Sequence, residues 1–360
     1  MRPSGSISLA LSLVWLSAAA TTISAQQRSR VQLPAEPSCR ECTIELTTVA
    51  RLGQPGDSVL LGALSGAVAM TSRGQFIALA GSGVQVAVYD ASGRFLLSFG
   101  KRGGGPGEFQ TLTDVRVGPG DSVIVADGRN NVQVFGPTFE YARTIRIPDP
   151  GSLSQALFLP SGAIIKQTSA SRLWVMDLNG TVRDSIPVVP VPGSRTCARC
   201  NKRWLAPARA PGRFWSSVSN RYQIELLDRT GTAHQILTRR TLWFVPWDSV
   251  PRVTRERSAP EPTLGPLRED SDGLLWCLAR VADPKWKEVD TRGPASVAMF
   301  NGLDDGMISV IDPRAGVVLA ERRLAGSVGF VGQTDLVFSQ EEDSDGYVTL
   351  HIQRVQLKRR

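Results

Sequence analysis

The most constraining feature of this chain is a short unit of four alternating strands that recurs along its length. Its clearest copy lies between Phe99 and Pro148 and reads FGKRGGGPGEFQTLTDVRVGPGDSVIVADGRNNVQVFGPTFEYARTIRIP. Apolar and polar residues alternate in four runs separated by Gly, Asp and Asn turns: Val115–Val117, Val123–Val125, Val132–Phe135 and Arg143–Ile147. A four-stranded unit of roughly 45 residues is typical of one blade of a β-propeller.

Six such units can be aligned by their turn glycines and alternating strands. Four of them keep nearly the same internal spacing and are aligned on Gly74, Gly120, Gly162 and Gly212. The fifth begins at Asp272 and the sixth near Ser327. A β-sandwich, the competing all-β class, would not produce six similar units of this length. The sequence therefore predicts an all-β, six-bladed propeller.

The sixth unit lacks a final strand, because the chain reaches Arg360 soon after VTLHIQRVQL. An unassigned strand, CTIELTTVARLG, lies upstream of the first unit between Cys42 and Gly53. An open ring would leave strand edges exposed at its two terminal blades. We therefore expect Thr43–Leu52 to pair as the outermost strand of the last blade and to close the ring.

The first 25 residues have the three parts of a secretory signal peptide. Arg2 gives a positive start, Ile7–Ala20 is apolar, and Ile23-Ser24-Ala25 is an acceptable cleavage site. The apolar run is short for a membrane anchor, which is the alternative interpretation. No Cys follows it where a bacterial lipoprotein would be lipidated. We expect a protein that is secreted or periplasmic and has no transmembrane segment, organised as a signal peptide at 1–25, a disordered linker at 26–38 and a propeller at 39–360.

The strings FGKRGGGPGEF and DSVIVADGRNNVQVF resemble the NHL repeat, which is a propeller blade motif. The resemblance is strongest in the second unit and weaker in the first. It implies an exported six-bladed propeller of the kind found in bacteria. Members of the wider NHL group bind proteins, RNA or cell-wall material, and a few related propellers are metal-dependent lyases or lactonases. The resemblance therefore implies a fold and leaves the function open.

Three long insertions interrupt the regular blade pattern. Val191–Pro211 joins units three and four, Arg239–Glu269 joins units four and five, and Asp283–Gly302 lies inside unit five. Connections at these positions of a propeller open on one face, and long loops on a rigid scaffold are common binding sites. The insertions carry basic and aromatic residues, of which we single out Arg195, Arg199, Arg203, Arg240, Trp243, Trp247, Trp286 and Lys287.

Arginine and tryptophan together suit the recognition of phosphate, sulfate or carboxylate groups and stacking on rings or sugars. The net charge of +8 favours an anionic partner. The competing interpretation is that the tryptophans seal the loops over the ring while the arginines reach solvent along apolar surface. The expected function is non-catalytic binding of a protein or an anionic glycan of the cell envelope. Nucleic acid is not expected as a partner, no cofactor is expected, and the oligomeric state is left open.

Two CxxC pairs, Cys39 with Cys42 and Cys197 with Cys200, admit three interpretations. The four thiolates could bind zinc, the pairs could cross-link, or each pair could close a local disulfide. Export favours disulfides. The two pairs are expected on opposite faces of the ring, which favours local bridges. Cys277 falls in an expected strand and is interpreted as a small buried apolar residue.

A metal-dependent enzyme of the lactonase or lyase kind is the alternative function. Such propellers place carboxylate, Asn or His side chains around the central channel. The chain has only two histidines, His234 and His351, and both are expected in outer strands away from the axis. A site built on Asp127 and Asn130 is the form of this alternative that the sequence leaves open.

Overall fold

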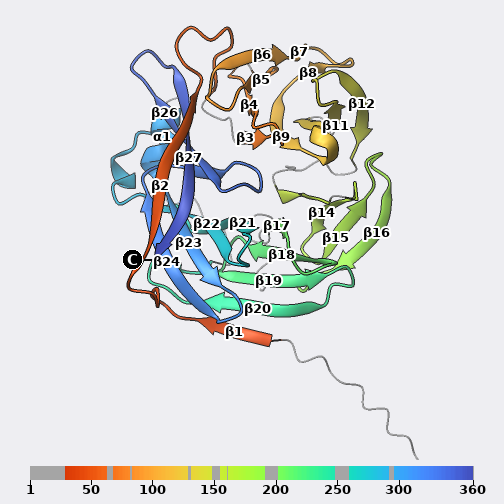
Figure 1. Ribbon diagram of the computed structural model, residues 1–360. Coiled ribbons are helices and arrows are strands. Elements are labelled where there is room, and N and C mark those ends of the chain that lie inside the picture. Colours follow the sequence, from red (N-terminus) through yellow and green to blue (C-terminus); the bar gives the residue numbers. More distant parts are fainter. Residues whose placement is uncertain are drawn as a thin grey trace, which may run out of the picture.

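The computed structural model describes residues 29–62, 68–81, 83–128, 131–147, 155–159, 161–190, 202–247, 259–291 and 296–359. In these residues six sheets are arranged around a central axis, as Figure 1 shows. Each contains four antiparallel strands, and one of them carries a fifth strand. This arrangement confirms the six-bladed propeller that the repeats predict. A short parallel pair, β7 (Lys101–Arg102) and β8 (Glu108–Phe109), lies between blades one and two.

The blades follow one another in chain order. Blade one holds β3 (Val68–Met70), β4 (Phe76–Leu79), β5 (Val86–Tyr89) and β6 (Phe95–Phe99). Blade two holds β9 (Leu112–Val117), β10 (Val123–Asp127), β11 (Asn131–Phe135) and β12 (Tyr141–Arg146). Blade three holds β13 (Leu157–Phe158), β14 (Ile164–Ser169), β15 (Arg172–Met176) and β16 (Val182–Pro187).

Blade four holds β17 (Arg203–Pro207), β18 (Arg213–Val218), β19 (Gln223–Asp228) and β20 (Ala233–Arg239). Blade five holds β21 (Thr263–Glu269), β22 (Leu275–Ala282), β23 (Asp304–Asp312) and β24 (Val317–Leu324). Blade six holds β25 (Val328–Phe330), β26 (Leu336–Glu342) and β27 (Val348–Arg359), with β2 (Cys42–Leu52) as its fourth strand.

The ring closes as the sequence predicts. Strand β2 pairs antiparallel with β27 along its length, from Cys42 opposite Arg359 to Leu52 opposite Leu350. Figure 1 shows the two strands side by side, red beside dark blue. Ile44, Ala50 and Leu52 are buried, whereas Thr43, Glu45, Thr47, Thr48 and Arg51 are exposed. The pairing gives β27 a hydrogen-bonded neighbour on its outer edge, so the backbone groups of that edge are not left unpaired.

The segment before β2 differs from the disordered linker expected at 26–38. Residues Ser29–Leu33 form strand β1, which pairs parallel with the outer edge of β20 and makes a fifth strand of blade four. The expectation was wrong because the unpaired edge of β20 provides backbone partners, and because Leu33 is buried against blades four and five. Farther on, the Ser38 backbone N–H and hydroxyl both donate to the Val318 carbonyl of β24.

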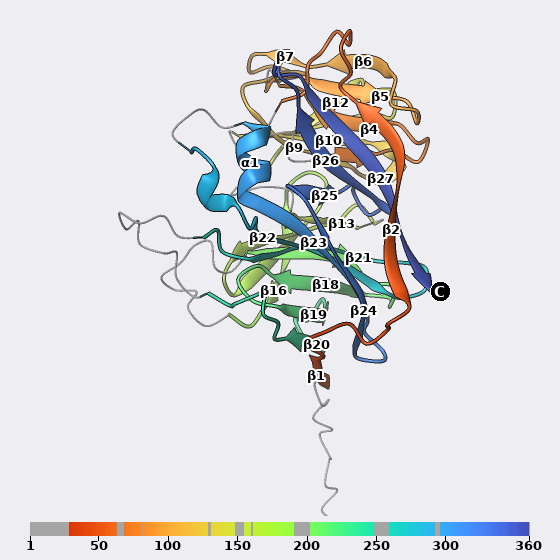
Figure 2. The same ribbon diagram turned by 90° about the vertical axis from the view of Figure 1, so that its left-hand side faces the viewer.

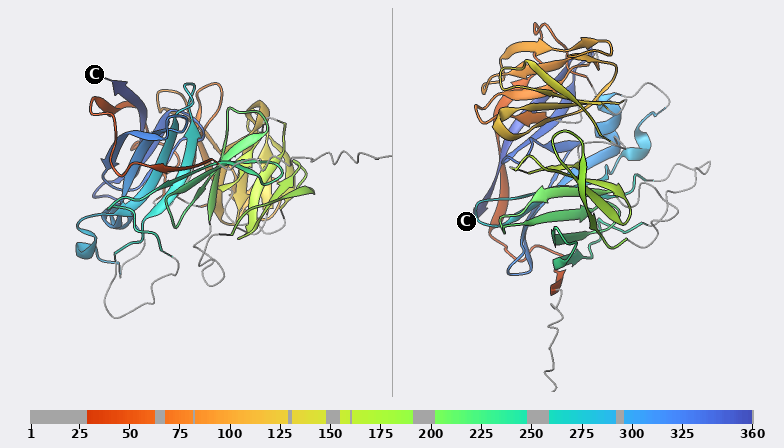
Figure 3. Two further views of the ribbon diagram at one scale, coloured as in Figure 1. Left: turned by 90° about the horizontal axis from the view of Figure 1, so that it is seen from below. Right: turned by 90° about the vertical axis from the view of Figure 1, so that its right-hand side faces the viewer.

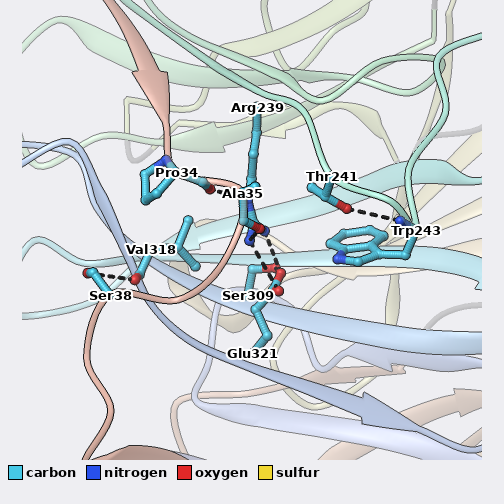
Figure 4. A network of polar contacts seen from close by, with 9 residues as sticks. All are labelled: Pro34, Ala35, Ser38, Arg239, Thr241, Trp243, Ser309, Val318 and Glu321. Atoms are coloured by element: carbon cyan, nitrogen blue, oxygen red, sulfur yellow. Dashed lines mark hydrogen bonds and ion pairs between the residues drawn. The ribbon is translucent and has the colours of Figure 1, made fainter.

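Arg239 holds this N-terminal segment against the ring (Figure 4). Its side chain is fully buried and forms a two-point ion pair with Glu321 of β24. The same guanidinium donates to the carbonyl oxygens of Pro34 and Ala35. Ser309 donates a further hydrogen bond to Glu321. One buried cation thus joins blade four, blade five and the segment after β1, and we call this set the Arg239 clasp.

The hydrophobic core is divided into clusters that lie between neighbouring blades. Ile77 and Val86 of blade one pack with Val115 and Val123 of blade two, and the other interfaces repeat this arrangement. Alternation along each strand supplies an apolar residue to each of its two faces, because successive side chains point to opposite sides of a sheet. Each blade is therefore held by its neighbours on both sides.

Tight glycine turns add a second contact between blades. In three blades the turn between the third and fourth strands presses against a backbone carbonyl of the preceding blade's last strand. A Cβ at these positions would lie 2.1–2.5 Å from that oxygen, and each glycine has a positive φ. The pairs are Gly93 with Arg51, Gly180 with Arg146 and Gly231 with Pro187.

Replacing Gly231 with alanine is expected to destabilise the protein more than the same change at Gly212. Both residues have positive φ, but Gly212 has open space around it whereas a Gly231 side chain would meet Pro187. The backbone strain costs about 1–2 kcal/mol in either variant, and the clash adds ~1–3 kcal/mol at Gly231 alone. Urea unfolding of the two variants measures the difference. Equal losses would show that this contact does not stabilise the ring.

The connection from β22 to β23 contains the helical elements η3 (Trp286–Glu288) and α1 (Val297–Leu303). The Ser296 hydroxyl accepts from the Met299 N–H, and the Glu342 carboxylate accepts from the Val297 N–H, so two N–H groups at the start of α1 have acceptors. Figures 2 and 3 place α1 and the C-terminal end of β27 on opposite faces of the ring, and we call the first the α1 face. Within the described residues, no helix has the length and apolar character needed to cross a membrane.

Candidate functional site

A cavity of about 710 Å³ lies where the inner strands of blades four, five and six approach the axis. We call it the channel cavity. Strand β9 of blade two also contributes to its wall, as do α1 and the residues before β13. Its volume is in the range of pockets that bind small organic molecules. The polar lining includes Arg116, Gln155, Lys202, Glu261, Arg280, Asn301 and Gln340, and the aromatic lining is Trp204, Trp247, Phe300, Phe330 and Phe338.

Trp247 is fixed at the cavity by three hydrogen bonds. Its indole N–H donates to the Pro262 carbonyl at 2.7 Å, and its backbone N–H donates to the Asn220 carbonyl at 3.1 Å. The Asn220 side-chain amide in turn donates to the Trp247 carbonyl at 2.6 Å. An indole held in this way offers an apolar surface without the cost of ordering it on ligand binding.

Strand β21 enters the cavity wall through a β-bulge. The register with β22 shifts between Leu264 and Leu267, and the intervening Gly265 and Pro266 both line the cavity. The Ser217 hydroxyl donates to the Gly265 carbonyl and fixes the bulge. Bulges turn backbone and side chains away from the regular ladder and are frequent beside binding sites.

Positive charge predominates among the ionisable groups of the cavity. Arg116, Lys202 and Arg280 line it, together with the single carboxylate of Glu261. Arg280 is 3.8 Å from Asp304, whereas Lys202 forms no ion pair within the described part of the chain. Burial raises the pKa of Glu261, because a partly desolvated carboxylate is less stable in its charged form. The ionisable groups that line the cavity are therefore mainly cationic.

Arg116 is held by Asp114, which lies two residues earlier on the same side of β9. The closest approach between the two groups is 3.3 Å, from Arg116 Nε to Asp114 Oδ1. Burial raises the pKa of the Asp114 carboxyl, while the charge of Arg116 acts in the opposite direction.

The structure brings one of the eight selected insertion residues to this cavity, namely Trp247. Arg240 is exposed at the end of blade four. Trp286 and Lys287 lie in η3, with the Lys287 ammonium 5.6 Å from the centre of the Trp286 ring. Arg195 and Arg199 lie outside the described residues.

Arg203 is buried and Trp243 is partly buried against the core, whereas both were expected on an exposed binding surface. The Arg203 guanidinium is buried and forms a 2.7 Å ion pair with Glu225 of its own blade. Trp243 packs edge-on against Tyr222 and Phe244 beside the Arg239 clasp. For Trp243 the alternative interpretation, in which tryptophan seals a loop over the ring, is the one that the structure supports.

Sequence reasoning missed Trp204 and Arg116 and did not select Lys202. A signal existed for two of them, because side chains alternate across a strand. Lys202 and Trp204 flank Arg203 in the sequence. Because the Arg203 side chain is buried, the side chains of its two neighbours lie on the opposite side of the strand. Arg116 gave no signal, because it sits in the most regular blade of the chain.

The remaining expectations concern cysteine and metal. Cys39 and Cys42 form a disulfide with a Cα–Cα distance of 5.3 Å, as expected, while Cys197 and Cys200 lie outside the described residues. Cys277 is a buried free thiol.

Both oxygens of Asp127 accept backbone N–H groups, from Gln110 and Thr111. Asn130 lies outside the described residues, and among those described no three His, Cys, Asp or Glu side chains are grouped to bind a metal.

Fold and cavity together define the class of this protein: it is a six-bladed β-propeller with a ligand-sized cavity at its axis. No family model matches the chain, and no curated protein matches it in sequence. Its fold is similar to that of a DUF4221 family member from Bacteroides vulgatus, with 12% identity, a TM-score of 0.60, and coverage of 88% of this chain and 99% of the other. It is also similar to a Bacteroides fragilis protein thought to be exported, with 12% identity, a TM-score of 0.55, and coverage of 91% and 100%.

A virginiamycin B lyase from Staphylococcus aureus overlaps more loosely, with 10% identity, a TM-score of 0.46, and coverage of 88% of this chain and 100% of the lyase. At 12% identity, the two Bacteroides structures show a similar fold alone, and function must be argued from the site itself.

Proposed function

We propose that this protein is an exported, non-catalytic binding propeller that holds an acidic glycan in the channel cavity. The observation that carries the proposal is the combination in one cavity of fixed tryptophan with three cations and one carboxylate. Indole rings stack on the apolar faces of rings, side-chain amides donate to and accept from hydroxyl groups, and cations pair with carboxylates.

The insertions singled out in the sequence support this proposal through their positions. Trp247 belongs to the connection between blades four and five, and α1, which carries Phe300 and Asn301, belongs to the connection inside blade five. Both connections border the cavity on the α1 face. The proposed ligand therefore lies beside the connections that contain Trp247 and α1, and the inner strands of blades four to six contribute to the wall around it.

The proposal is tested with tetragalacturonate and its fully methyl-esterified form, which share size and hydroxyl pattern but differ in charge. Calorimetry should show that the acid binds and that the ester binds at least about tenfold more weakly, a difference of ~1.4 kcal/mol. Raising the salt concentration should weaken binding of the acid only. Equal affinity for the two probes would contradict an anionic ligand.

Trp204→Ala is expected to weaken binding of the acid by about tenfold, because it removes a stacking surface worth roughly 1–2 kcal/mol. Trp286→Ala is the matched control, since Trp286 lies in η3 and does not line the cavity. Tryptophan fluorescence quenching follows both titrations. If Trp286→Ala weakened binding and Trp204→Ala did not, the ligand would have to lie outside the channel cavity.

A further inference from the structure

The buried arginines Arg203 and Arg239 have their donors occupied. Arg203 donates to Ser216, to Glu225 and to the Val189 carbonyl. Arg239 donates to two carbonyls and to both oxygens of Glu321. This is the expected pattern, because a guanidinium carries five N–H donors and a buried donor without an acceptor is costly.

Arg116, like the buried Arg268, departs from this pattern, because its Nε has no hydrogen-bond partner. Its side chain is 21% exposed, yet its only hydrogen bond within the described part of the chain is a 3.5 Å contact from Nη2 to Asp114. Its Nε is buried and makes no hydrogen bond, although it lies 3.3 Å from the Asp114 carboxylate. Most donors of this guanidinium therefore have no acceptor among the described residues.

The position of Arg116 places these donors at the channel cavity. Arg116 lines the channel cavity from blade two, while Lys202 and Arg280 line it from blades four and five. Asp114 is almost wholly buried, with 1% of its side chain exposed, so it restrains the guanidinium from within the wall and does not itself line the cavity. The neighbouring Val115 faces the other way, into the core between blades one and two.

We infer that Arg116 is the residue that selects for an anionic ligand, by donating its free N–H groups to an oxyanion of the bound glycan. The inference rests on the proposed function and names the residue behind its charge preference. A guanidinium presents a planar fork of donors that matches two oxygens of one carboxylate or sulfate group. Either group could be the source of the oxyanion, and the experiment below separates them.

The test measures how far the preference for acid over ester depends on Arg116. Arg116→Gln should weaken tetragalacturonate binding at least about tenfold while changing binding of the methyl ester less than twofold, so the preference disappears. Arg116→Lys keeps the positive charge but lacks the planar pair of N–H donors. It should therefore retain only part of the preference for the acid over the ester. Arg183→Gln is the matched control, because Arg183 pairs with Asp177 on outer strand β16 of blade three.

A second variant covers the case in which Arg116→Gln fails to fold because Asp114 loses its cation. The double variant Asp114→Asn, Arg116→Gln replaces the ion pair with two neutral amides and should show the same loss of preference. A sulfated disaccharide titrated against the same proteins shows whether sulfate can replace carboxylate.

The outcomes separate the two proposals. If the wild type prefers the acid and both variants keep that preference, Arg116 is not the selecting residue and the proposed function stands. If the wild type binds the acid and ester equally, or neither, the proposed function and this inference fall together.

Discussion

Deleting residues 43–52 should lower the melting temperature by about 10 °C or more. The deletion removes the strand that completes blade six and exposes the outer edge of β27 over its whole length. It also removes Ile44 and Leu52, which are buried in the clusters on the two sides of blade six. Each such side chain contributes roughly 2–5 kcal/mol, and a protein of this size loses about 2 °C per kcal/mol.

Calorimetry of the deleted and full chains measures this effect, and a chain lacking residues 29–33 is the matched control. Strand β1 is a fifth strand on a blade that already has four, so its loss should lower the melting temperature much less. The exposed β27 edge should also make the chain without β2 associate at higher concentration, as light scattering would detect. Equal melting temperatures for the full chain and the chain without 43–52 would mean that closure does not stabilise the ring.

Arg239→Met should destabilise the protein by about 3–5 kcal/mol, which is the usual cost of leaving a buried charge without its partner. The substitution leaves Glu321 facing the interior without a cation and removes the donors to Pro34 and Ala35. Guanidinium unfolding measures the loss of stability. Hydrogen exchange in residues 29–38 should rise in the same variant, because the clasp holds that segment.

Two further variants distinguish the clasp from ordinary ion pairing. Arg183→Met removes a surface pair with Asp177 and should cost no more than ~1 kcal/mol. The double variant Arg239→Met, Glu321→Leu leaves no unpaired charge and should recover part of the stability. It should not restore protection of residues 29–38, because their carbonyls still lack donors. Full recovery of that protection would show that β1 is held by its strand pairing alone.

Most of the architecture could be predicted because it repeats. The alternation of apolar residues and the turn glycines predicted the six units. Because the last unit lacked a fourth strand, the unassigned strand now seen as β2 was predicted to complete it. Strand β1 could not be predicted in the same way. It has only five residues, and its partner edge on β20 exists only after blade four has formed. The short helix α1 was missed because seven residues give too little periodicity to recognise.

The candidate site was harder to predict, because it depends on which side of a strand a residue takes. Arg203 was selected because its insertion is rich in basic residues. It forms a buried ion pair, whereas Trp204, the next residue along β17, lines the cavity. The cavity also combines residues from blades two, four, five and six, and such residues become neighbours only when the ring is closed. Trp247 was found because its insertion is long and rich in aromatic residues.

Strand β2 belongs to the beginning of the chain and its partner β27 belongs to the end. During synthesis, β2 must therefore wait until every blade between the two strands has emerged. Contacts so distant along a chain form slowly. Pairing of β2 with β27 is thus expected to be the last and slowest step of folding, and the sixth blade stays incomplete until β27 has been made.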